Sequence, residues 1–143
     1  MNDQNLHARR WDVPALKAGG MVALVFAVPF SIAARWAADS RDDSGLAITF
    51  TLGAVIGFVL GAGCAAWVQR VGLPLSHGLV TAIATYSAAQ TVFIVLRLVR
   101  GDDVNWFAAL FNLSIVSGAG LVGGALGKRL RAKGFIPSTE RTS

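Results

Sequence analysis

Four long apolar stretches, separated by short polar segments, constrain this chain more than any other feature. They cover roughly residues 13–36, 46–68, 76–98 and 105–127. As an α-helix of about 22 residues, each would extend about 33 Å, which exceeds the hydrocarbon thickness of a bilayer. Because only helices and closed barrels satisfy their backbone hydrogen bonds in lipid, stretches of this length predict four transmembrane helices.

The composition and the short connections indicate a single domain. Hydrophobic residues make up 54% of the chain and charged residues 15%, and the mean hydropathy is +0.56. This is too apolar for an ordinary soluble domain. Connections this short make consecutive helices antiparallel neighbours. We therefore predict an all-α integral membrane protein, one four-helix antiparallel bundle spanning residues 1–143, with short polar tails at 1–12 and 128–143.

The basic residues are distributed unequally over the two sides of the predicted helices. One side holds Arg9, Arg10, Lys17, Arg70, Lys128, Arg129, Arg131, Lys133 and Arg141, and the other holds Arg35, Arg41, Arg97 and Arg100. The positive-inside rule therefore predicts that both termini and segment 69–75 are cytoplasmic. The tryptophans fit this orientation, with Trp11 and Trp67 at the cytoplasmic interface and Trp36 and Trp106 at the outer one.

The net charge of +5 is interpreted in the same way. In a soluble chain it would suggest nucleic acid, but here it predicts orientation in the lipid bilayer and attraction to anionic lipid head groups at the cytoplasmic face. The excess of Arg over Lys fits a GC-rich bacterium, so the predicted location is a bacterial inner (cell) membrane. Nucleic acid is not an expected partner.

A cleaved secretory signal peptide is the alternative for the first stretch. Arg9 and Arg10 precede it, and "SIA" at 31–33 resembles a cleavage site. The apolar segment from Val13 to Ala34 is longer than the hydrophobic region of a signal peptide. This length favours a retained first helix.

Small residues recur at helical spacing inside the predicted spans. They are Gly19, Ala23 and Ala27 in the first span, Gly53, Gly57, Gly61 and Ala65 in the second, and Gly120, Gly124 and Gly127 in the fourth. Such stripes let helix backbones approach closely in lipid. A phosphate-binding loop would need its glycines in a turn before a helix, whereas these lie in mid-span. We therefore predict helix-packing surfaces.

Two similar loops suggest a duplicated helical hairpin. "SRDDSG" at 40–45 joins the first and second predicted helices, and "RGDDVN" at 100–105 joins the third and fourth. Gly61/Gly123 and Gly72/Gly134 share an offset of 62. This pattern is typical of parallel repeats related by an axis along the membrane normal. Such an axis could gather the loop aspartates around a cation, but the neighbouring Arg41 and Arg100 favour solvated loops.

Residues that could perform chemistry are scarce. No Asp, Glu, Lys or Arg lies deep inside a predicted span, which argues against a proton-coupled pump and against the small multidrug-resistance exporters. Cys64 has no second cysteine, and no Ser-His-Asp, Cys-His or HExxH arrangement is present. Ser76 is the expected N-cap of the third helix, with His77 on the surface beside it. We expect no enzyme activity, catalytic residue, cofactor or metal.

The polar residues expected inside the membrane are Tyr86, Gln90, Asn112 and Ser117. Gln90 and Asn112 lie at similar depths, so one interpretation is a hydrogen bond between them worth about 0.6 kcal/mol. The other interpretation is a polar path for a small solute, with Tyr86 and Ser117 below the two amides. The need of an amide in hydrocarbon for a partner favours the first.

The stretches "GAGCAAWVQRVGLPLSHGLVTAIATY" (61–86) and "GLVGGALGKRLR" (120–131) resemble those of a group of uncharacterised bacterial four-span membrane proteins. These have Gly-rich second and fourth helices and a His-Gly pair opening the third. The resemblance implies no activity. We predict a structural or accessory component of a membrane assembly, as a homodimer or in a larger complex. The alternative is a small passive channel or transporter with a neutral polar path between the third and fourth helices.

Overall fold

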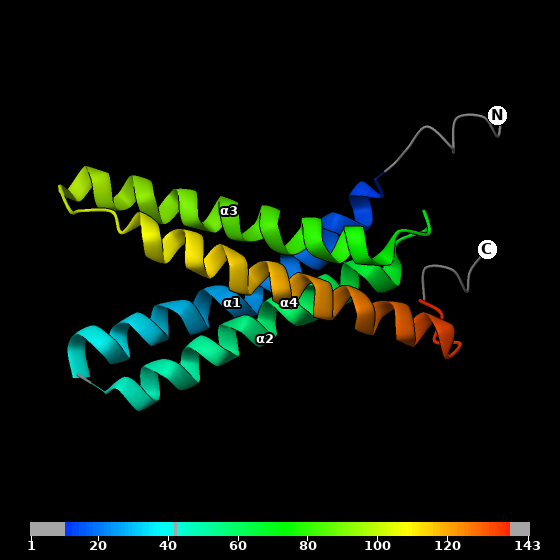
Figure 1. Ribbon diagram of the computed structural model, residues 1–143, viewed down its shortest axis with the longest axis horizontal. Helices are drawn as coiled ribbons and strands as arrows, with labels where there is room; N and C mark the ends of the chain where they lie inside the picture. The colour runs from blue at the N-terminus through cyan, green and yellow to red at the C-terminus, as the bar shows by residue number, and fades with distance from the viewer. Residues whose placement is uncertain (1–10, 42, 138–143) are drawn as a thin grey trace.

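The computed structural model describes residues 11–41 and 43–137, which form four α-helices (Figure 1). They are α1 (Val13–Arg41), α2 (Ser44–Val68), α3 (Pro74–Arg100) and α4 (Trp106–Ala132). Each is long and apolar enough to cross a membrane. The prediction of an all-α, four-span protein is therefore confirmed. Arg9, Arg10, Asp42 and Arg141 lie outside the described residues.

Local hydrogen bonds at the first and last turns of the helices satisfy backbone groups that have no partner within the helix. The Oδ1 atom of Asp43 accepts from the Leu46 amide at 2.9 Å, and the Oδ1 atom of Asn105 accepts from the Ala108 amide at 2.9 Å. At the end of α3, Gly101 takes a left-handed conformation with φ of 76°. α2 therefore begins two residues before its predicted stretch and α3 ends two residues after its own, whereas α4 begins at Trp106, one residue inside its predicted stretch.

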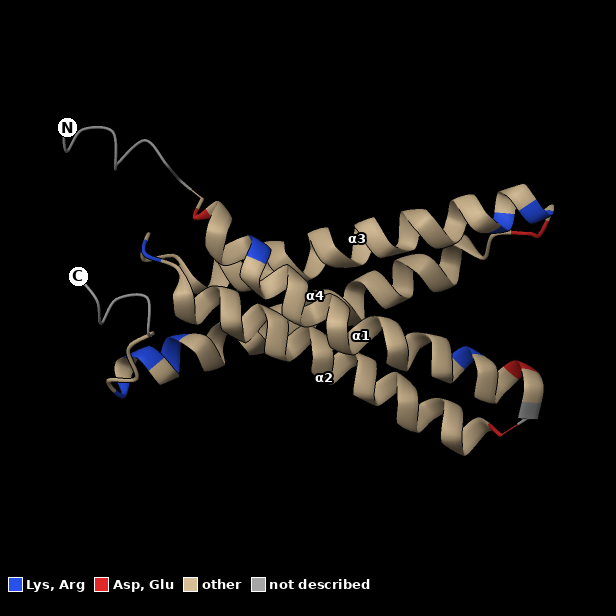
Figure 2. Ribbon diagram, turned by 180° about the vertical axis from the view of Figure 1, so that it is seen from behind, with Lys and Arg blue, Asp and Glu red and all other residues tan. Residues whose placement is uncertain are grey.

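Consecutive helices run antiparallel and form two hairpins that cross each other (Figure 1). The hairpins, α1–α2 and α3–α4, are close together at the end that holds the described chain ends and the α2–α3 connection, here called the termini end. They separate toward the opposite end, here called the loop end. Figure 2 shows the charged residues near these two ends, with the middle of the molecule uncharged.

The core consists mainly of small side chains. Ala23, Ala27, Ala62, Ala82 and Ala119 are each at most 6% exposed, and Ala54, Phe58 and Val116 complete the cluster. Lipid supplies no hydrophobic driving force for helix association, so close backbone approach and dispersion contacts hold such a bundle together.

The small-residue stripes of α1 and α2 face each other. A Cβ atom added at Gly61 would lie 2.5 Å from the carbonyl oxygen of Gly19 and 2.6 Å from the Cβ of Ala23. A Cβ added at Gly57 would lie 2.9 Å from the Ala27 nitrogen, and one at Gly53 would meet the ring of Phe30. Ala65 lies against Gly19 at the termini end of this contact.

The glycines of α4 belong to two interfaces, whereas the spacing predicted one stripe. Gly120 and Gly124 pack against α3, where a Cβ at Gly120 would lie 2.9 Å from the Cβ of Ala82. Gly127 packs with Gly123 against α2, and a Cβ at Gly127 would lie 2.5 Å from the carbonyl oxygen of Gly63. Because the hairpins cross, two different helices contact one broad side of α4.

The offset of 62 does not relate equivalent packing positions. Gly61 contacts α1, whereas Gly123 contacts α2. The corresponding close contacts within the two hairpins are Gly19 with Gly61 and Gly78 with Gly120, which are related by an offset of 59. An offset suggested by a few glycines therefore gave the wrong register between the hairpins.

Candidate functional site

A cavity of about 250 Å³ lies between the two hairpins. All four helices line it, through Leu24, Ala27, Val28, Ser31, Ala34, Arg35, Thr51, Ala54, Val55, Phe58, Tyr86, Ala89, Gln90, Phe93, Asn112, Ile115 and Val116. Most of these side chains are apolar. Arg35, Thr51 and Asn112 are exposed, so the cavity is open to the surroundings of the bundle.

Three of the four predicted intramembrane polar residues line this cavity. They are Tyr86, Gln90 and Asn112. The Tyr86 hydroxyl donates to the carbonyl oxygen of Ala109 at 2.8 Å and so joins α3 to α4. Ser117 is not part of the lining, because its hydroxyl donates to the Leu113 carbonyl of its own helix at 2.7 Å.

The hydrogen bond expected between Gln90 and Asn112 is absent from the described part of the chain. Similar depth along two helices fixes height but leaves the rotation of each helix undetermined. Here both amides border the cavity, and neither has a hydrogen-bond partner among the described residues.

Arg35 also lines the cavity, and the sequence did not predict this role for it. Its guanidinium carbon lies 4.9 Å from the ring centroid of Phe93 on α3. Arg35 is six residues before the end of α1 at Arg41, about 9 Å along the helix axis. Arg35 belongs by charge with the basic residues of the loop end, but it lies in the cavity wall. The signal was the presence of an Arg inside the predicted apolar stretch 13–36.

The cavity is closed toward the termini end. Phe58 and Tyr86 meet edge to face there, with ring centroids 6.3 Å apart and planes at 64°. Beyond these rings lie Ala62, Ala82 and Ala119 of the core and the glycine contacts of all four helices. Close-packed backbone therefore fills the bundle interior on that side.

At the termini end, His77 is fully buried, and the expectation of a surface histidine is wrong. Its Nδ1 atom donates to the Leu73 carbonyl at 2.9 Å, which leaves Nε2 to accept from the Asp12 amide at 3.0 Å. The Trp11 ring centroid lies 5.4 Å from that of His77. Helix α3 begins at Pro74, with Leu73 as its N-cap in place of the expected Ser76, so His77 belongs to the first turn.

Gln69, at the end of α2, is also at the termini end and is only 2% exposed. Its Oε1 atom accepts from the amides of Val71 and Gly72, each at 2.8 Å, and its carbonyl accepts from Arg131 of α4. The Oδ2 atom of Asp12 accepts from the Arg70 amide at 3.0 Å. These bonds join the start of α1, the α2–α3 connection and the end of α4.

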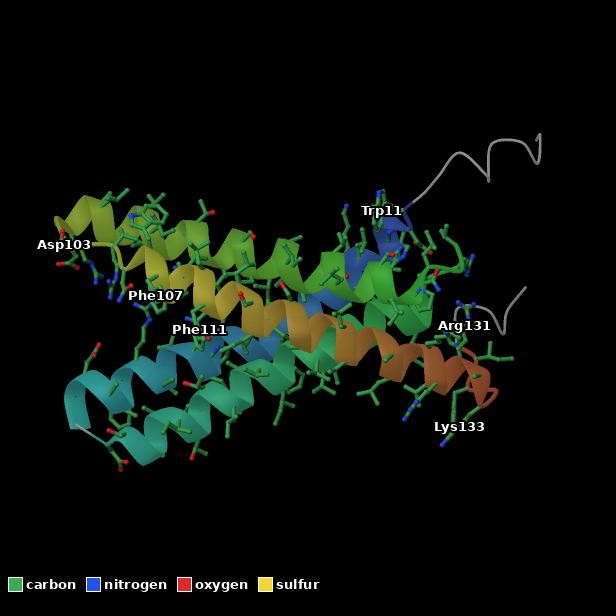
Figure 3. The ribbon with its side chains drawn as sticks, in the orientation of Figure 1. Trp11, Asp103, Phe107, Phe111, Arg131 and Lys133 are labelled. Carbon is green, nitrogen blue, oxygen red and sulfur yellow. The ribbon has the colours of Figure 1, made fainter. Side chains whose placement is uncertain are left out.

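Figure 3 relates the two ends of the molecule. Trp11, Arg131 and Lys133 lie at the termini end, and Asp103 lies at the loop end. The two acidic loops occupy separate arms of the splayed loop end (Figure 2), and within the described residues no three His, Cys, Asp or Glu side chains come together. The suggestion of a gathered cation site therefore finds no support in the geometry.

One outward-facing surface of α3 is made of small and hydroxyl residues. Ala84, Ser87, Ala88 and Thr91 are all exposed, and we call them the α3 small-residue face. Ser87 is the midpoint of α3, thirteen residues from Pro74 and thirteen from Arg100. Thr91 donates to the Ser87 carbonyl at 2.8 Å, but the Ser87 hydroxyl has no hydrogen-bond partner in the part of the chain that the structure describes.

Comparisons with protein-family models, with curated proteins and with solved structures find no match to this chain. The predicted resemblance to uncharacterised four-span proteins thus remains a prediction. The structure supports a protein of four long apolar helices, consistent with four membrane spans.

Proposed function

We propose that this protein is a structural or accessory component of a membrane assembly, without catalytic activity of its own. Its contact with a partner helix is then the α3 small-residue face. The predicted setting is a bacterial inner membrane with both termini cytoplasmic. There the basic residues at the termini end, such as Lys128 and Lys133, would lie against anionic lipid head groups.

The observation that carries the proposal is the exposed Ser87 hydroxyl. A polar group at mid-membrane is poorly accommodated by lipid and usually finds a partner on a neighbouring helix. Ala84 and Ala88 flank Ser87 at the spacing that permits close backbone approach. The glycines of α1, α2 and α4 that were predicted as packing surfaces already contact neighbouring helices inside the bundle. The α3 small-residue face remains available for a second protein.

Replacement of Ala88 by Phe tests this contact. Ile56 offers a matched control, because it is the midpoint of α2, twelve residues from either helix end, and is 58% exposed. We expect the wild-type protein and Ile56→Phe to migrate as the same complex in native gels of mildly solubilised membranes, and Ala88→Phe to migrate as a monomer. Similar thermal unfolding of both variants would show that the fold is intact. An Ala88→Phe complex of unchanged size would contradict the proposal.

The second candidate function is a small passive channel or transporter, favoured by the position of Gln90 and Asn112 in the cavity wall. A continuous path would require the packed half of the bundle to open. Solute flux into liposomes that depends on Gln90 and Asn112 would favour this candidate, and its absence would leave the accessory role.

A further inference from the structure

We propose that the cavity between the hairpins is a binding site for an anionic phospholipid of the leaflet next to the loop end. Its head group would meet Arg35, and one acyl chain would enter the cavity. This site is separate from the α3 small-residue face and does not depend on the proposed partner contact.

The first argument is the charge of the cavity wall. Arg35 is the only charged residue of the lining, and within residues 11–41 and 43–137 no carboxylate forms an ion pair with it. The i+4 residue Asp39 is exposed and does not pair with it. A guanidinium at the edge of the hydrocarbon favours an anionic partner, and phosphate oxygens match its bidentate geometry.

The second argument is the set of unused hydrogen-bonding groups that line the same cavity as Arg35. The amides of Gln90 and Asn112 and the hydroxyl of Ser31 border the same cavity and have no partner among the described residues. They can donate to phosphate or ester oxygens. The Tyr86 hydroxyl, in contrast, already donates its hydrogen to Ala109.

The third argument is the shape and polarity of the remaining wall. From Arg35 toward the termini end, the lining consists mainly of apolar side chains such as Val28, Val55 and Ile115. It ends at the rings of Phe58 and Tyr86. About 250 Å³ is far more than the space that one water molecule needs, and an apolar cavity of this kind favours hydrocarbon over water. A charged mouth above an apolar pocket matches an amphiphile.

The position of Arg35 selects a membrane lipid as the source of this amphiphile. Arg35 lies about 9 Å from the end of α1, near the depth at which head groups meet acyl chains. Exposed lining residues, including Leu24 at 40% exposure and Ile115 at 39%, open the cavity toward the bilayer. A lipid can therefore enter from the side without crossing the bundle.

Native mass spectrometry of the full chain in mild detergent tests the site, with phosphatidylglycerol and phosphatidylcholine of the same acyl chains as probes. We expect phosphatidylglycerol to bind about tenfold more tightly or better, because it presents a net negative charge to Arg35, whereas the choline cation of phosphatidylcholine offsets the charge of its phosphate. Arg35→Gln should remove this preference and Arg35→Lys should keep part of it. Arg100→Gln is the matched control, since Arg100 is exposed at the same end but outside the cavity, and it should keep the full preference.

Filling the cavity separates a seated lipid from simple attraction to surface charge. Ala89 lines the cavity, so Ala89→Phe should reduce phosphatidylglycerol binding while Arg35 remains in place. Unchanged selectivity in Arg35→Gln, or unchanged binding in Ala89→Phe, would overturn the inference. Tighter binding of a free medium-chain carboxylate such as decanoate than of phosphatidylglycerol would also overturn the assignment to a membrane lipid.

Discussion

His77 and Thr81 lie one turn apart on the same buried side of α3, yet their polar groups have opposite surroundings. His77 uses both ring nitrogens in hydrogen bonds, one to Leu73 and one to the Asp12 amide. The Thr81 hydroxyl is buried without a partner among the described residues. A buried polar atom contributes to stability when it is bonded and opposes stability when it is not.

These surroundings predict opposite effects of two substitutions. His77→Leu should lower the free energy of unfolding by about 1–3 kcal/mol, because the Asp12 amide loses its acceptor. Thr81→Val should leave stability unchanged or raise it by about 1 kcal/mol, because it removes an unbonded hydroxyl with little change of shape. Denaturation in detergent followed by circular dichroism measures both. Equal destabilisation by the two changes would refute this account of the α3 interface.

At the scale of the helices, glycines occupy two different environments in this protein. Gly61 lies in the α1–α2 contact, where an added Cβ would be 2.5 Å from a backbone oxygen. Gly118 is exposed on α4, and an added Cβ there would have no neighbour within 4 Å. Close packing therefore requires the absence of a side chain at Gly61 but not at Gly118.

The comparison of Gly61→Leu with Gly118→Leu isolates this effect. Gly61→Leu should destabilise the bundle by about 1–3 kcal/mol or more, because backbone on the facing helix cannot move aside easily. Gly118→Leu should be neutral or stabilising by up to about 1 kcal/mol, since glycine is a poor helix former. Thermal unfolding in the same detergent provides the measurement. A stable Gly61→Leu protein would mean that α1 and α2 do not pack through this stripe.

At the scale of the whole molecule, the two ends differ in charge and in packing. At the termini end, hydrogen bonds of Asp12, Gln69 and His77 connect the chain segments, whereas the hairpins diverge at the loop end (Figure 1). Most basic residues lie at the termini end, which the positive-inside rule assigns to the cytoplasm. This distribution predicts the orientation of the molecule in the membrane.

Single cysteines introduced into a Cys64→Ala background test the orientation. Asp39→Cys and Asp102→Cys lie at the loop end, and Val71→Cys and Lys133→Cys lie at the termini end, all at exposed positions. In intact cells an impermeant maleimide should label the first two and leave the second two unlabelled until the membrane is opened. Labelling of Val71→Cys or Lys133→Cys in intact cells would reverse the predicted topology.

The sequence by itself determined the four helices, their antiparallel order and the segregation of charge to the two ends. These properties depend on the length of each hydrophobic stretch and on short connections, so they can be predicted from residues close together in the sequence. The small residues of α1 and α2 were equally visible, because a period of four residues defines one side of a helix.

The tertiary structure alone decided which of these sides meet and what lies between them. The crossing of the hairpins divides the α4 glycines between α3 and α2, and the rotation of α3 buries His77 and turns Gln90 toward a cavity. The same crossing places Arg35 beside Phe93, 58 positions away in the chain. Helix rotation and crossing depend on the sum of many contacts between distant residues, and no single helix sequence contains that information.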